Sequence, residues 1–160
     1  MTHAAAWTRI AGAVLTALLA SGVVNAAGAP STLRLDDSLS HTVPPNVQLQ
    51  WRPLPPSAGA ALSMEGWVRV NVRIDTAPVA GRSGRVYMVL PPEQRGLELV
   101  WTSQGRLQAG RLTPGERALV YSGVLGAGLL EDQITVRLRA SPDWDSPTRR
   151  LNVHFEWQPD

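Results

Sequence analysis

The side chains that could perform chemistry are few and widely spaced. A zinc site needs several ligands at close quarters. Two histidines follow residue 26, His41 and His154. His154 has only Asn152 and Glu156 as polar neighbours along its run, which gives at most one carboxylate partner. We therefore interpret His154 as a surface residue and predict neither a metal site nor a cofactor.

The residues needed for nucleophilic or acid–base catalysis are also missing. The chain has no Cys, and Ser122 precedes a turn-like Gly, without the helix of a nucleophile elbow. The Gly-Ala-Gly stretch 126–128 lacks the Lys and the helix of a phosphate-binding loop. An acid pair for glycoside hydrolysis could come only from carboxylates in turn-like sequence, where such residues commonly form turns: Glu131, Asp132, Asp143 and Asp145. The sequence predicts no enzyme.

The loop SPDWDSP, residues 141–147, is the candidate ligand site. Trp144 stands between Asp143 and Asp145 and is framed by two prolines. An aromatic ring beside acids is typical of sites that contact a sugar or a cationic group. Alternatively, Trp144 folds back over the edge of the domain while both acids only form turns. The sequence leaves these two interpretations open.

Composition favours one domain made of short elements. The chain has 160 residues, of which 44% are hydrophobic, with 6 Trp against 1 Phe and 2 Tyr. The 13 Pro and 14 Gly argue against long helices. All 15 basic residues are Arg, the net charge is only +2, and the arginines alternate with apolar residues along the chain. Because no basic patch forms, we predict no nucleic-acid partner.

Residues 1–26 have the features of a secretory signal peptide. Arg9 is its only charge, and an apolar run of about 15 residues and then small residues follow. Spanning a bilayer takes about 20 residues, so we favour cleavage before Ala27 over an uncleaved anchor. No Cys lies at the boundary for lipid attachment. We expect an exported protein without stable membrane insertion.

The domain-forming elements read as strands, because apolar and polar residues alternate with period two. Residues 134–140 and 151–157 alternate in this way, and we expect them to be neighbouring strands joined by the polar loop. The clearest upstream strand is 64–75, which has four β-branched residues in register. The run 86–90 suits a strand buried on both sides, and 97–102 is followed by a weaker strand, 106–112, that pairs back. A further strand is expected within 116–125.

About eight candidate strands and no convincing helix predict an all-β fold. We expect an immunoglobulin-like antiparallel β-sandwich over residues 45–160, preceded by an extended N-terminal segment, 27–44. Two short strand signals lie near this boundary. Leu33 and Leu35 form the first, and Val47, Leu49 and Trp51 form the second.

From residue 67 onward the order of motifs resembles the pilin domain of chaperone–usher fimbriae, in particular the alpha class that includes the colonisation-factor fimbriae. The matching features are the strand VRVNVRIDT, a Gly-Arg turn, the strand VYMVL closed by proline, the hairpin LVWTSQGRL, and the C-terminal run LNVHFEW. The signal peptide and the absence of Cys also suit that class.

The resemblance implies a sandwich short of one strand, which a periplasmic chaperone and then the N-terminal segment of the next subunit complete. The expected partners are other pilin subunits, the chaperone and an outer-membrane usher, and the expected destination is the fimbrium at the cell surface. Residues 31–43 would supply the donor strand, in whose register Asp37 and His41 fit poorly. Its candidate pocket-filling side chains are Leu33, Leu35, Leu39 and Val43. Those expected to line the groove are Leu151, Val153, Phe155 and Trp157. Residues 47–51 are an alternative donor. The competing hypothesis is a self-contained periplasmic or secreted binding module that uses the loop around Trp144.

Overall fold

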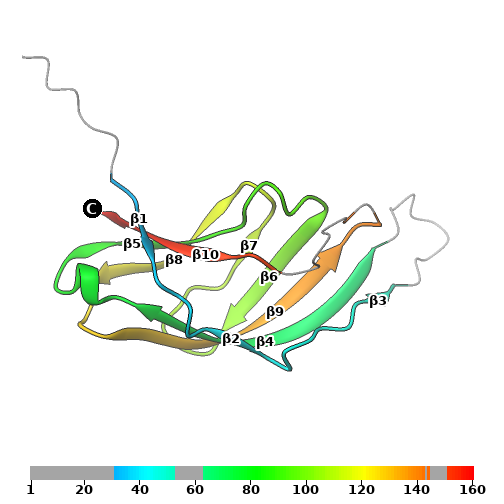
Figure 1. Cartoon of the computed structure of the whole chain (residues 1–160), viewed down its shortest axis with the longest axis horizontal. Coiled ribbons are helices and arrows are strands. Elements are labelled where there is room, and N and C mark those ends of the chain that lie inside the picture. Colours follow the sequence, from blue (N-terminus) through cyan, green and yellow to red (C-terminus); the bar gives the residue numbers. More distant parts are fainter. Residues whose placement is uncertain (1–30, 53–62, 143, 145–150) are drawn as a thin grey trace, which may run out of the picture.

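The computed structural model describes residues 31–52, 63–142, 144 and 151–160. The expected signal peptide and two members of the candidate loop, Asp143 and Asp145, lie outside the described residues. The described chain forms two antiparallel β-sheets packed face to face (Figure 1). This confirms the prediction of an all-β sandwich.

The larger sheet has six strands, in the order β2-β4-β9-β6-β7 with β3 also against β4. Its centre is the twelve-residue pairing of β4 with β9, and β6 pairs back with β7 as expected. β-branched residues at alternate positions of β4 favour this extended backbone and face the core. The strand bounds are β2 (His41–Val43), β3 (Gln50–Trp51), β4 (Met64–Asp75), β6 (Leu97–Ser103), β7 (Gly110–Leu112) and β9 (Leu129–Ala140).

The smaller sheet has the order β1-β10-β5-β8. Its strands are β1 (Leu33–Leu35), β5 (Ser83–Val89), β8 (Arg117–Val124) and β10 (His154–Pro159). A single 3-10 turn, η1 (Ala77–Val79), is the one helical element in the described part of the chain. The segment predicted to be extended thus supplies an edge strand to each sheet, β1 to the smaller and β2 to the larger.

Side chains from both sheets form one core between the layers. Trp101 and Trp157 are its largest members. The indole N–H of Trp101 donates a hydrogen bond to the carbonyl of Gln108, 2.9 Å away. Trp157 lies directly over Gly84, where an added methyl group would overlap the indole ring. Gly84 therefore allows the large ring to approach the backbone of β5 closely.

Two expectations about the strands were wrong. The runs that form β9 and β10 are not neighbours, because β9 pairs with β4 and β6 whereas β10 pairs with β1 and β5. Alternation indicates which face of a strand is buried but not which sheet it joins. Nor is β5 buried on both sides: its outward Tyr87 is only half-buried, with the guanidinium of Arg117 4.5 Å from its ring centre. A long side chain covers that face in place of another layer.

The neighbour relations follow the immunoglobulin-type layout. In that layout strands A, B, E and D form one sheet and C, F and G the other. Here β2, β4, β9 and β6 take the first four places, and β5 and β10 take the C and F places. The G place, beside β10, is occupied by β1 from the N-terminal side of the chain. Three strands lie outside this layout: β8 on the far edge of β5, and the short strands β3 and β7 of the larger sheet.

Candidate functional site: the inter-sheet cleft

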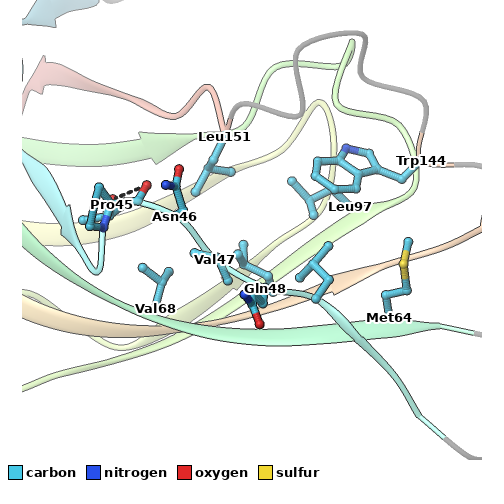
Figure 2. A pocket seen from close by; sticks show the side chains of 12 residues that line it. Pro45, Asn46, Val47, Gln48, Met64, Val68, Leu97, Trp144 and Leu151 are labelled. Atoms are coloured by element: carbon cyan, nitrogen blue, oxygen red, sulfur yellow. Dashed lines mark hydrogen bonds between the residues drawn. The ribbon is translucent and has the colours of Figure 1, made fainter.

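An apolar cleft remains between the two sheets. One hollow of about 960 Å³ and a second of about 390 Å³ share Thr42, Pro45 and Leu151 in their linings. Figure 2 shows Leu151 on one side of the larger hollow and Val68 and Met64 of β4 on the other. The sandwich is therefore incompletely filled along this edge.

The wall formed by the C-terminal run contains three of the four residues predicted to line a groove. Leu151, Val153 and Phe155 line the smaller hollow, facing side chains of the inner surface of the larger sheet. Trp157, the fourth, is buried beside β1 and takes no part in either lining. The guanidinium of Arg82 lies 4.3 Å from its ring centre. Hydrophobic side chains thus continue from the cleft into the core along β10.

The segment 45–49 runs along the rim of the larger hollow. Val47 and Leu49 pack against the core, so the second N-terminal strand signal pairs only at β3. Gly66 makes this close packing possible, because an added Cβ would lie 2.7 Å from Leu49 Cδ2 and 3.0 Å from the carbonyl oxygen of Gln48. Pro44 and Pro45, whose backbone nitrogens cannot donate to a sheet, stand at the start of this stretch and limit pairing there.

Trp144 lies at the other end of the larger hollow, close to Leu97 (Figure 2). A turn holds it there: the amide of Ser141 donates to the Gly96 carbonyl at 2.8 Å, and the amide of Trp144 donates to the Ser141 carbonyl at 3.0 Å. Gly96 has a positive φ of 77°, which favours glycine. The indole is half-buried, and its N–H is buried without a hydrogen-bond partner in the described structure. Trp144 therefore faces an apolar space and packs against the core, which agrees with the interpretation that it folds back over the edge of the domain.

Of the candidate donor residues, only Leu35 enters the core. Leu35 is 2% exposed, whereas Leu33 is 41%, Leu39 55% and Val43 44% exposed. β1 runs antiparallel to β10 over three residue pairs, with Leu33 opposite Trp157 and Leu35 opposite Phe155. In this chain the N-terminal segment is thus paired within its own domain.

The end of β1 is fixed by Asp36. Its carbonyl accepts a hydrogen bond of 2.8 Å from the amide of Asp75 in the other sheet, and its carboxylate accepts one of 2.9 Å from the amide of Ser38. The hydrogen bond from Ser38 lowers the pKa of Asp36. Next in the chain, Asp37 lines the smaller hollow, and burial raises its pKa. The mouth of the cleft is polar whereas its interior is apolar.

This arrangement suits binding by burial of an apolar surface. The linings consist mainly of aliphatic and aromatic side chains, which favour an apolar or extended peptide occupant. Within the described ranges, no three His, Asp or Glu side chains group in a way that could hold a metal ion. His154 instead lies 3.2 Å from Glu156 of its own strand.

Among the described residues no helix is long and apolar enough to cross a membrane. Comparison of the chain with protein-family models, with curated proteins and with solved structures finds no match. The inference of function consequently rests on the cleft and on the strands around it.

Proposed function

We propose that this protein is an exported structural or minor subunit of a surface fimbria and that it assembles by exchange of its N-terminal strand. The observation that carries the proposal is the pairing of β1 with β10 over only three residues, next to an apolar cleft that the chain leaves unfilled. Other subunits, a periplasmic chaperone and an outer-membrane usher are the partners of such a scheme.

The position of β1 supports exchange. It occupies the G place of the sandwich, although it comes from the N-terminal side of the chain. The same residues from a second copy could make the same hydrogen bonds to β10, so exchange conserves the pairing. Strand addition of this kind gains affinity from main-chain hydrogen bonds and specificity from alternate side chains.

The side-chain burial that keeps β1 in its own domain contributes little free energy. One side chain, Leu35, is fully buried, which is worth about 1.5–3 kcal/mol. Since β1 stops at Leu35, the wall formed by Leu151 and Val153 lies beyond its reach. A longer segment from a neighbour could fill this part of the cleft and so bind more tightly than β1 does.

A cysteine pair at Arg34 and Glu156 tests the proposal. These residues are direct partners in the β1–β10 register, and partners across antiparallel strands lie about 4.5–5.5 Å apart, within the reach of a disulfide. The chain has no other Cys, so every crosslink is assignable. If strands exchange, the oxidised R34C/E156C protein gives a ladder of covalent oligomers on non-reducing gels.

The matched control is the pair Thr102 and Thr135, which are partners between β6 and β9 at the centre of the larger sheet. T102C/T135C should crosslink only within one chain. The experiment is repeated over a range of protein concentrations that includes those at which the subunits should assemble. If R34C/E156C also crosslinks only within one chain throughout that range, strand exchange is contradicted.

A self-contained binding module is the second candidate. It is favoured by the pairing of both β1 and β2 within the same chain and by the half-buried Trp144 at the cleft. This protein would stay monomeric in the crosslinking experiment and would take an apolar ligand between its sheets. An increase in melting temperature with such a ligand, abolished by Trp144→Ala, would support it.

A further inference from the structure

The outer face of the larger sheet carries an exposed tryptophan. Trp67 lies in the middle of β4 with 60% of its surface exposed, while its neighbour Val68 is 2% exposed in the core. Successive residues of a strand point to opposite faces, so Trp67 lies on the side away from the cleft. A large apolar ring in this position contributes nothing to the core.

Trp67 and five neighbouring side chains form a grid on this face. The register places Trp67 opposite Arg137, Arg69 opposite Thr135, and Asn71 opposite Gln133. The guanidinium of Arg137 lies 5.6 Å from the centre of the Trp67 ring. Gln133 Nε2 donates a hydrogen bond of 3.0 Å to Asn71 Oδ1. The distance along β4 from Trp67 to Asn71 is about 14 Å. This length is enough to contact more than one ring of a ligand.

The charge around Trp67 is positive. Three acids of this face are neutralised: Glu65 pairs with Arg52 and Arg139, Glu98 pairs with Arg111 and Arg139, and Glu131 pairs with Arg73. Within the described ranges, Arg69 and Arg137 make no salt bridge. Two guanidinium groups are therefore available beside the exposed ring.

A shallow hollow of about 390 Å³ lies at the far end of the grid. It is lined by His41, Asn71 and Gln133 together with Val72, Arg73, Glu131 and Asp132, and Glu131 is paired with Arg73. Asn71 Nδ2 lies 3.0 Å from His41 Nε2. This end of the face presents amide and imidazole groups, which can donate and accept hydrogen bonds.

We propose that this face binds an acidic polysaccharide, one built from uronic acid units. A sugar ring stacks on Trp67, its carboxylate is held by Arg69 and Arg137, and hydroxyl groups of the next unit bond Asn71 and Gln133. Guanidinium–carboxylate pairs supply charge-assisted hydrogen bonds. This inference is independent of strand exchange, because it uses the opposite face of the sheet.

An acidic peptide fits this face less well. β4 already pairs with β9 on one side and with β2 and β3 on the other. Its main chain is thus largely engaged, and a peptide could not add to it as a further strand. Recognition here must come from side chains on a flat surface, which suits the flat face of a sugar ring.

Isothermal titration of the full mature chain with oligogalacturonate tests the proposal. Trp67→Ala and Arg69→Ala should each weaken binding about tenfold. Trp51→Ala is the matched control, since Trp51 is 57% exposed at the end of the same sheet but lies outside the grid. It should leave affinity unchanged. Far-UV circular dichroism and melting temperature verify that each variant folds, as expected for exposed positions.

Two further probes decide the ligand class. Methyl-esterified oligogalacturonate keeps the rings but loses the charge, and it should bind at least about tenfold more weakly if Arg69 and Arg137 hold a carboxylate. Poly-L-glutamate keeps the charge but lacks the rings and should bind weakly as well. The proposal is overturned if oligogalacturonate does not bind at millimolar concentration, if either probe binds as tightly, or if W51A weakens binding as much as W67A.

Discussion

Glu65 shows how a single side chain of the sheet surface is held in its charged state. It is only 8% exposed, yet Arg139 Nε lies 3.0 Å from its Oε1 and Arg52 Nε lies 2.7 Å from its Oε2. Burial by itself would raise the pKa of Glu65, but the hydrogen bond from Arg139 and the charge of Arg52 outweigh it and lower that pKa. The same contact raises the pKa of Arg139.

Because the folded pKa of Glu65 is lowered, its ionised form stabilises the fold above the unfolded value of about 4.3. This contribution is lost as the pH falls through the folded pKa. We expect Glu65→Gln to lower the free energy of unfolding by roughly 1–2 kcal/mol at pH 7 and by less at pH 3. Urea titrations at both values measure the difference. Glu93→Gln, at an exposed position, should have no such effect, and a loss for E65Q that is equal at both values would contradict the assignment.

At the scale of elements, β1 is the strand on which the proposed assembly depends. It is three residues long, and its neighbour β10 continues beyond it toward the cleft. A strand at the edge of a sheet exposes unpaired backbone groups, which can recruit another strand. The turn at residues 38–39 separates β1 from β2, and the two strands join different sheets.

We predict that Leu35→Ala destabilises the domain whereas Leu39→Ala does not. Leu35 is 2% exposed and Leu39 is 55% exposed, so only the first truncation leaves a cavity. The expected loss of unfolding free energy is about 2–3 kcal/mol for L35A and less than about 0.5 kcal/mol for L39A. Urea denaturation of both variants measures it. Equal losses of unfolding free energy for L35A and L39A would show that β1 does not bury Leu35 in the core in solution.

At the scale of the whole molecule, the sandwich is complete in strand pairing but not in packing. The two sheets share one core, and the cleft opens between them along one edge, where members of that core form part of its lining. Without any Cys in the chain, packing and hydrogen bonds alone hold the layers together. An added segment that fills the cleft should therefore stabilise the entire domain.

A chain that begins at Ser40 lacks β1 and should melt at a lower temperature than the mature protein. Adding a peptide of residues 31–39 should raise its melting temperature in a dose-dependent way, since a ligand at 100 times its dissociation constant adds about 2.7 kcal/mol. Thermal melts followed by circular dichroism measure this effect. The same peptide with Leu35 replaced by Asp serves as the control, and equal effects of the two peptides would contradict a specific β1 site.

The local alternation of apolar and polar residues predicted much of the fold, because the period of two of a strand can be recognised from adjacent residues. β4 has the predicted bounds, and Leu97, Leu99 and Trp101 of β6 face the core as expected. The same logic placed Leu151, Val153 and Phe155 on the apolar side that lines the cleft. The weaker segments were less well predicted: the run 106–112 gives only β7, and the run 47–52 gives only β3.

The sequence by itself determined the strands and their buried faces, because alternation is a property of neighbouring residues. Only the tertiary structure decided which strands pair, since hydrogen-bond partners are set by packing across the whole domain. It separated β9 from β10, brought β1 to the G place, turned Trp144 toward an apolar cleft, and aligned Trp67 with Arg137. These arrangements depend on contacts between residues far apart in the chain. The periodicity of neighbouring residues carries no information about such long-range contacts.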